Sequence, residues 1–85
     1  MYFVYILWSR ITNRHYTGST QDLENRLKEH NGGETTSLRS GIPWKVVHVE
    51  EFVSRREAVQ REKQIKARGA KRYLGDKFRG VAQPG

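Results

Sequence analysis

The chain has 85 residues, and 35% of them are hydrophobic, which suits one small domain with a modest core. It has no cysteine, so disulfide bonds and cysteine-ligated zinc are excluded, and this composition fits a reducing cytoplasm. The apolar run over residues 2–8 is too short to span a membrane and follows no basic segment, so no membrane anchor or signal peptide is expected. We expect one domain over residues 1–79 and a flexible C-terminal tail over residues 80–85.

The net charge of +7 comes from one region of the chain. Residues 55–79 hold ten Lys and Arg against three Asp and Glu, whereas the other residues hold six of each kind. A positive surplus confined to one segment indicates binding to a polyanion such as nucleic acid. The alternative is a solvated basic face, or a surface for an acidic protein partner.

Three segments have strand-like patterns. In residues 2–8 both alternating sets of side chains are apolar, as in a strand covered on its two faces. Residues 12–14 have turn composition, so residues 15–18 would return as the second strand of a hairpin. A third strand is expected over residues 44–53. Its alternation places on one face Trp44, Val46, His48 and Phe52, and on the other Val47, Val49 and Val53.

The first predicted helix follows the hairpin. Ser19 or Thr20 can cap its start, and an Asn-Gly-Gly segment at residues 31–33 ends it. Leu23, Leu27 and His30 fall on one face, which we expect to point inward. The polar segment 32–43 is predicted to be a loop.

Two further helices follow the third strand. Ser54 can cap a helix that runs to about Arg68, Gly69 breaks it, and Ala70–Phe78 can form a last helix. The element order is therefore β-β-α-β-α-α, which makes the chain an α+β domain. The first two strands should be antiparallel neighbours with helices packed on the sheet. The pattern leaves the position of the third strand open.

Glu62 interrupts the inward stripe of the helix over residues 54–68. At 100° per residue, Ala58 and Ile65 lie within 20° of each other, and Glu62 falls between this pair and Val59. Its carboxylate must therefore be paired, neutralised or bound to a cation. A buried ion pair with Arg26 or a lysine and a metal site are equally compatible with this position.

Arg26 and His30 lie on or beside the inward face of the first helix. A guanidinium at this place can hold a phosphate in bidentate fashion and stabilise negative charge on its oxygens. His30 can donate to the same phosphate or share the role of base. An ordinary boundary arginine and a helix-end histidine with satisfied hydrogen bonds are the simpler interpretations.

Tyr5 and Tyr16 would be core residues in most strands. Here the paired strands bring both toward the start of the first helix, beside Gly18, where backbone can approach a ligand closely and an anion is favoured. A tyrosine acts as a base only if its pKa, ordinarily about 10, is lowered or its proton is relayed onward.

Together these residues resemble the GIY-YIG nuclease superfamily, in particular its small stand-alone bacterial members. Phe3-Val4-Tyr5 resembles the GIY element and Tyr16-Thr17-Gly18 the YIG element. Arg26, His30 and Glu62 match the helix arginine, a following histidine and the metal-binding glutamate of that family. The segments 43–47 (PWKVV) and 61–66 (REKQIK) are similar to the sequences usual in the stand-alone members, and the resemblance spans about residues 2–75.

The resemblance implies a three-stranded antiparallel sheet flanked by helices, and endonuclease activity on DNA, on branched, nicked or damaged structures. It implies one divalent cation, Mg²⁺ or Mn²⁺, at Glu62, a proton acceptor at Tyr16 and charge stabilisation by Arg26. Tyr5 would orient water or phosphate. Candidate contacts to the DNA backbone are Gly18, Lys63, Lys66, Lys71 and Arg72.

Two departures from the family pattern keep other functions open. Phe3 replaces the glycine of the GIY element, and no asparagine follows Glu62 in the chain. Eighty-five residues also leave no room for a separate DNA-recognition domain, so binding should be weak, tolerant of sequence and sensitive to salt. The alternatives are a non-catalytic nucleic-acid-binding module, or a basic interaction domain for an acidic or repair-related protein.

Overall fold

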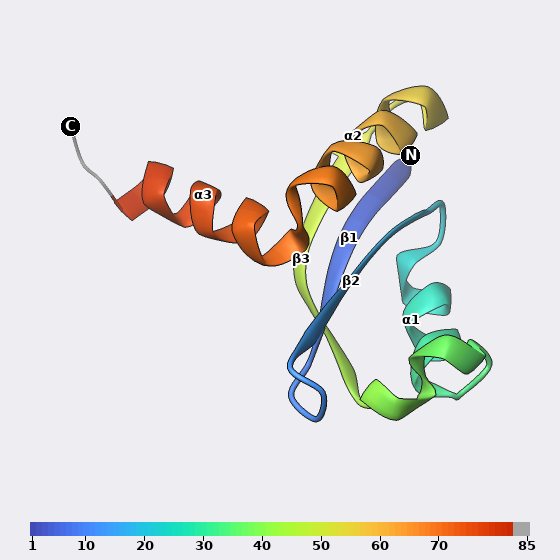
Figure 1. The fold of residues 1–85 in the computed structure, drawn as a ribbon. Coiled ribbons are helices and arrows are strands. Elements are labelled where there is room, and N and C mark those ends of the chain that lie inside the picture. Colours follow the sequence, from blue (N-terminus) through green and yellow to red (C-terminus); the bar gives the residue numbers. More distant parts are fainter. Residues whose placement is uncertain (83–85) are drawn as a thin grey trace.

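Three antiparallel strands form one sheet in the order β2-β1-β3 (Figure 1). The structure, a computed structural model, describes residues 1–82 and the side chains of residues 1–76. The strands are β1 (Tyr2–Ser9), β2 (Arg14–Thr20) and β3 (Trp44–Phe52). This confirms the α+β fold and the antiparallel hairpin, and it places the third strand beside the first.

The central strand β1 separates two apolar clusters, as its uninterrupted apolar run predicts. Val4 and Ile6 point to one face and pack with Ala58 and Ile65. Side chains at the alternate positions point to the other face and join a second cluster, whose buried members are Tyr5, Leu7, Leu38 and Trp44. Four consecutive residues of β1 are at most 1% exposed, so both faces of the strand are covered.

The predicted facing of β3 is wrong from its middle onward. The pairing of β1 with β3 shifts between Ile6 and Leu7, so that Leu7 faces Val46 and Ile6 faces His48. Trp44 and Val46 therefore lie on the face of Leu7. His48 and Phe52, predicted to share that face, lie on the opposite one. A β-bulge adds one residue to a strand, and it reverses the alternation beyond it.

The first helix, α1 (Leu23–Asn31), starts later than predicted. Asp22 caps it and accepts a hydrogen bond from the backbone N–H of Asn25, at 3.0 Å. Ser19 and Thr20 are still part of β2, so neither is the cap. The predicted inward face is confirmed for Leu23, Leu27 and His30.

The segment between α1 and β3, predicted to be a loop, contains a short 3₁₀ helix, η1 (Thr36–Gly41). Its Leu38 is buried, and the carbonyl of Leu38 accepts a hydrogen bond from Nε1 of Trp44 at 2.7 Å. The Asn31 side chain holds the same tryptophan by accepting from its backbone N–H at 2.7 Å and donating to its carbonyl at 3.1 Å. The polar composition of the segment hides these anchors.

Two helices follow β3. In α2 (Arg55–Arg68), Ser54 is the N-cap as predicted, and it accepts from the Glu57 N–H at 3.2 Å. Gly69, with φ of +91°, turns the chain into α3 (Ala70–Ala82), which projects away from the sheet (Figure 1). Three residues of the predicted tail thus belong to α3, and residues 83–85 lie outside the described residues.

A polar network fastens the start of α3 to the sheet. The Tyr73 hydroxyl donates to Glu50 on β3, and Arg61 pairs with the other oxygen of that carboxylate at 3.2 Å. Burial and the bond to the carboxylate raise the pKa of Tyr73 to about 12. No helix within residues 1–82 combines the length and apolar character needed to cross a membrane.

Candidate active site

Tyr5, Tyr16 and His30 form an aromatic group on the α1 face of the sheet. Tyr5 pairs with Gly18 across β1 and β2, and Tyr16 pairs with Leu7 two positions further along β1, so both phenol rings point to the same face. The ring centres of Tyr16 and His30 are 5.4 Å apart, and that of Tyr5 is 6.3 Å and 6.2 Å from these two. The structure therefore brings three sequence-predicted site residues into one group.

Gly18 makes this group sterically feasible. A Cβ atom at this position would lie 2.5 Å from the Tyr5 hydroxyl oxygen and 3.2 Å from the Tyr16 ring. Real Cβ atoms essentially never come that close to another heavy atom. The absence of a side chain at Gly18 lets the Tyr5 hydroxyl pass over β2 toward α1.

His30 is held at both ring nitrogens. Its Nε2 lies 3.1 Å from the Tyr5 hydroxyl, and its Nδ1 lies 2.9 Å from the hydroxyl of Thr35. The ring is only 2% exposed. Burial and the nearby Arg26 guanidinium lower the pKa of His30, so the neutral imidazole is favoured, with one nitrogen donating and the other accepting. His30 therefore fixes the position of the Tyr5 hydroxyl.

The surroundings of Tyr5 keep its phenol protonated. Burial, followed by the proximity of Tyr16, raises the pKa of Tyr5 well above its ordinary value, although Arg26 opposes the shift. Glu62 adds to the increase, so the two predicted site residues are near enough to interact. A tyrosine with this pKa can donate a hydrogen bond but cannot take up a proton at neutral pH.

Glu62 lies on the opposite, α2 face of the sheet. Its Oε1 accepts a hydrogen bond from the Ser19 hydroxyl at 2.5 Å, and its Oε2 lies 2.6 Å from Nζ of Lys66. The carboxylate is 19% exposed, as its place on the inward stripe of α2 predicts. Of the partners expected from the sequence, the structure selects a lysine one turn along the helix and not Arg26.

The partners of Glu62 outweigh the effect of its burial. Burial alone would raise its pKa, but the hydrogen bonds from Lys66 and Ser19 lower it overall. The carboxylate is therefore ionised at neutral pH.

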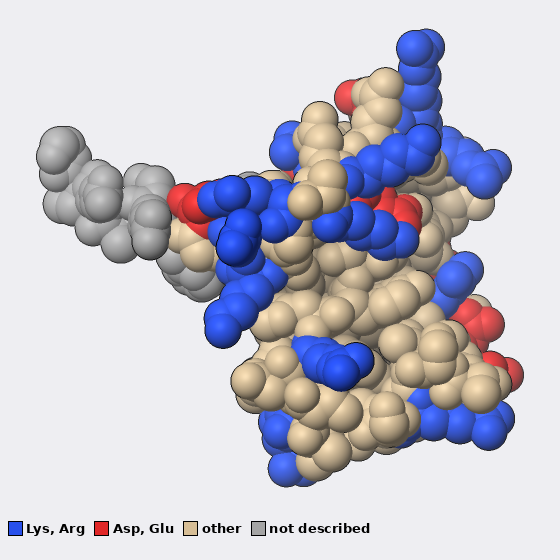
Figure 2. Space-filling view, in the orientation of Figure 1, with Lys and Arg blue, Asp and Glu red and all other residues tan. Residues whose placement is uncertain are grey.

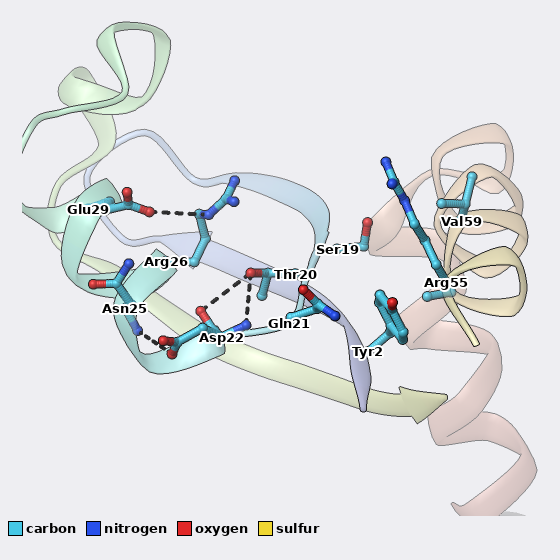
Figure 3. Close-up of a pocket in the computed structure, with 11 residues that line it drawn as sticks. Tyr2, Ser19, Thr20, Gln21, Asp22, Asn25, Arg26, Glu29, Arg55 and Val59 are labelled. Atoms are coloured by element: carbon cyan, nitrogen blue, oxygen red, sulfur yellow. Dashed lines mark hydrogen bonds and ion pairs between the residues drawn. The ribbon is translucent and has the colours of Figure 1, made fainter. Parts of the chain in front are cut away.

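An open cleft of about 490 Å³ connects α1 and α2 across the end of β2 (Figure 3). Ser19, Arg26 and Arg55 line it from β2, α1 and α2 respectively. Arg26 is half exposed, and its Nε pairs with Glu29 at 3.3 Å. Its guanidinium extends toward the gap between the helices (Figure 3). Arg26 and Ser19, whose hydroxyl holds Glu62, thus line the same cleft.

The lysines and arginine predicted to contact the DNA backbone do not all lie in one place. Lys and Arg side chains gather over α2 and the beginning of α3 (Figure 2). Lys66, Lys71 and Arg72 line a second groove beside β2, whereas Lys63 is exposed on α2 and lines neither this groove nor the cleft. The structure therefore separates Lys63 from the other three.

Sequence reasoning missed two residues of this region. Ser19 was assigned to a helix cap, but its pairing with Val4 turns its hydroxyl toward α2 and Glu62. The alternation of β2, extended two residues further, would have revealed this facing. Thr35 lies in the polar segment after α1, and no periodic signal identifies it as a partner of His30.

The residues around Glu62 fit a hydrated Mg²⁺ or Mn²⁺ ion better than zinc. Within the described part of the chain, no group of three or more His, Asp and Glu side chains could hold a metal. Zinc sites need three or four protein ligands, whereas Mg²⁺ is commonly held by one or two carboxylates, water and substrate phosphates. One ionised carboxylate beside an open cleft suits the second kind of site. Lys66 would have to release Oε2 to make room.

Comparison with protein families decides the relationship. The model of the GIY-YIG catalytic domain matches residues 1–74, which include both tyrosines, Gly18, Arg26 and Glu62. The chain belongs to the GIY-YIG family. It is also similar to UPF0213 proteins of archaea and bacteria. It is 40% identical to one of Haloquadratum walsbyi over 72 residues, 81% of each chain, and 37% identical to one of Bacillus velezensis over 82 residues, 92% of this chain and 82% of that protein.

A solved GIY-YIG-type structure supports the fold as well. The solution NMR structure of a UPF0213 protein of Bacillus halodurans is 29% identical in sequence, with a TM-score of 0.54. The match covers 95% of this chain and 85% of that one, so the likeness includes the sheet and the helices that carry the candidate site.

Proposed function

We propose that this GIY-YIG protein is a metal-dependent endonuclease that hydrolyses phosphodiester bonds in DNA, in branched, nicked or damaged structures. The main support is that Tyr5, Tyr16 and His30 form one group, and that Ser19, whose hydroxyl holds Glu62, lines a cleft together with Arg26. Membership of a catalytic-domain family alone names no residues. The phosphate would lie at the β2 edge, where the two faces of the sheet meet.

Tyr16 is assigned the role of accepting a proton from the water molecule that attacks phosphorus. The water oxygen forms the new P–O bond and one ester P–O bond breaks. The water proton passes to the Tyr16 oxygen while the tyrosine's own proton moves to solvent, and the leaving oxygen takes a proton from solvent. Tyr5 is excluded as acceptor because its raised pKa keeps it protonated. It is a positioning residue, held by His30.

Arg26 is assigned to the phosphate oxygens. Its guanidinium lines the cleft and is exposed enough to exchange Glu29 for a phosphate, with which it can form two parallel hydrogen bonds. Donors aimed at charge that develops in the transition state typically contribute about 2.7–4 kcal/mol each.

Glu62 is assigned to the divalent cation, with Ser19 holding one carboxylate oxygen in place. When bound, such a cation supplies Lewis-acid polarisation of the phosphoryl group and charge stabilisation at the leaving oxygen. Lys66, once released from Oε2, would be free to contact the phosphate.

One observation favours a binding module without catalysis. Both oxygens of Glu62 are already bonded, to Ser19 and to Lys66, so the carboxylate is satisfied without a metal. A module of this kind would bind DNA equally well with a chelator present and would not cut it.

A cleavage assay with a hydroxyl-deletion pair tests the proposal. Labelled plasmid, single-stranded and branched DNA are incubated with Mg²⁺ or Mn²⁺ and identically purified wild type, Tyr16→Phe or Tyr73→Phe. We expect Tyr16→Phe to cut about 10²–10⁴-fold more slowly, the usual contribution of one acid–base group. Tyr73→Phe removes a hydroxyl that bonds Glu50 away from the cleft and should cut at nearly the wild-type rate. Equal rates for all three proteins would contradict the proposal.

A further inference from the structure

A second groove lies on the other side of the candidate site, between β2 and the corner where α2 meets α3. It has a volume of about 590 Å³ and is lined from β2 by His15, Tyr16 and Thr17. The corner and the two helices supply the other wall, including Gly69, Lys71 and Arg72. We call it the α2–α3 groove.

The charge of the α2–α3 groove is positive, and no acidic residue is part of its lining. Arg68 is neutralised by Asp76, to which its Nε and Nη2 donate at 2.8 and 3.1 Å. Among the ion pairs of the described residues, none involves Lys71 or Arg72. Two uncompensated cations therefore face the groove, where they favour an anionic ligand.

The groove is continuous with the candidate active site. Tyr16, a member of the aromatic group, lines it, and so does Lys66, whose Nζ lies 2.6 Å from the Glu62 carboxylate. A ligand in the groove would thus contact Lys66, the ion-pair partner of Glu62, on one wall and β2 at Tyr16 on the other. A separate docking site for an unrelated molecule would not need this continuity.

The backbone at the corner favours the same ligand. Nothing lies within 4 Å of the place where a Cβ of Gly69 would stand, so the corner is open on that side. The first turn of α3 forms part of the wall, and the N–H groups at a helix N-terminus attract anions. Lys71 contributes, after burial, to a lowered pKa of His15, which shows that its charge acts across the groove.

We propose that the α2–α3 groove binds the phosphodiester backbone of a single nucleic-acid strand next to the bond that is cleaved. The inference rests on the proposed nuclease function. It gives the path of the substrate strand over the surface: from the cleft at Arg26 and Arg55, past Glu62, to Lys71 and Arg72. Tyr16 in the β2 wall places a strand bound there beside the residue assigned to the attacking water, which an acidic peptide would not require.

A charge-matched pair of double variants tests the groove. Lys71→Ala/Arg72→Ala removes the two unpaired cations of the groove. Arg10→Ala/Lys45→Ala removes two exposed cations that line neither the groove nor the cleft. Both variants lower the net charge by the same amount. Binding of a short labelled single-stranded DNA is followed by fluorescence anisotropy with EDTA present, so that no cleavage occurs.

The groove variant should bind about tenfold more weakly at moderate salt. Its plot of log affinity against log salt should be shallower by about 1.4, because each lost contact to a single strand removes about 0.7 from the slope. The control variant should keep the wild-type slope. Equal losses in both variants would overturn the inference, since only net charge would then matter. Displacement of the DNA by polyglutamate of equal charge, at equal concentration, would also overturn it in favour of an acidic protein ligand.

Cleavage by the same proteins separates this inference from the nuclease proposal. If groove and control variants bind alike while cleavage still requires Tyr16, the groove assignment is wrong and the nuclease stands. If binding depends on the groove but wild type cuts nothing, the groove stands as a binding site and the nuclease proposal is wrong.

Discussion

The histidine at position 30 shows how one side chain can serve both stability and site geometry. Its ring fills the space between α1 and Tyr5, and its two nitrogens connect β1 with the segment after α1. A protonated ring would have to give up the nitrogen that accepts a hydrogen bond. The neutral form is thus the one that the fold selects, in agreement with the lowered pKa of His30.

This selection predicts a stability that depends on pH. Below about pH 6.5 the unfolded chain binds a proton at His30 that the folded protein does not bind, so the free energy of unfolding should fall as the pH falls through this range. Urea unfolding between neutral pH and about pH 5 measures the decline. It should be smaller in His30→Gln than in wild type.

His15, whose pKa is also lowered, contributes to the same decline. His15→Gln is therefore the comparison variant, and the double variant should show the smallest decline of the four proteins. Glu62 does not interfere, because its lowered pKa moves its contribution to pH values below about 4.3. An identical decline in wild type and His30→Gln would show that the ring can be protonated in the folded protein.

At the scale of elements, the sequence predicts those features that depend on local patterns. The apolar run of β1 correctly indicates burial on both faces, and Ser54 and Gly69 correctly mark the ends of α2. The errors occur where a neighbouring element decides. The bulge in the pairing of β1 with β3 reverses the facing of His48 and the residues after it. The pairing of β2 with β1 keeps Ser19 and Thr20 in the strand, so that Asp22 becomes the cap of α1.

The candidate site divides in the same way. The spacing of Tyr5, Tyr16 and Gly18 predicts their meeting, because paired strands fix which residues oppose one another. The partners of Glu62 could not be chosen from sequence, since both Arg26 and a lysine were within reach. That choice depends on how α2 crosses β2, a tertiary feature that brings Ser19 to the carboxylate.

The pairing of Tyr5 with Gly18 across β1 and β2 offers a test of the site's geometry. Gly18→Ala places a methyl group 2.5 Å from the Tyr5 hydroxyl oxygen, so the ring must move and its bond to His30 should break. We expect a loss of about 1–3 kcal/mol in the free energy of unfolding, the usual cost of overpacking, together with reduced cleavage.

Gly75→Ala is the matched control for this substitution. Position 75 lies within α3, and nothing stands within 4 Å of the added methyl group. Alanine in a helix interior should stabilise the protein by about 0.5–1 kcal/mol. Denaturant unfolding of both variants gives the comparison. A Gly18→Ala protein as stable as wild type, with the Tyr5 and His30 signals unchanged in NMR spectra, would contradict the described packing.

At the scale of the whole molecule, a few residues from distant parts of the chain share one edge of the sheet. β2 carries Tyr16 toward one face and Ser19 toward the other, so this strand connects the aromatic group with Glu62. The cleft between α1 and α2 and the α2–α3 groove lie on either side of the connection. The positive charge of the chain is gathered over α2 and the start of α3, next to both (Figure 2).

This arrangement makes Glu62 the residue on which the proposed chemistry depends most directly. The decisive measurement is the rate of DNA cleavage under single-turnover conditions, titrated with Mg²⁺, for wild type, Glu62→Gln and Glu51→Gln. Glu51 is an exposed residue of β3 that lines neither the cleft nor the α2–α3 groove, so its variant controls for the loss of one negative charge.

Glu62→Gln should cut at least about a hundredfold more slowly at all Mg²⁺ concentrations, because an amide is a poor ligand and several kcal/mol of charge stabilisation are lost. Glu51→Gln should follow the wild-type titration. Cleavage by wild type that needs no Mg²⁺, or that proceeds at the same rate in Glu62→Gln, would contradict the account.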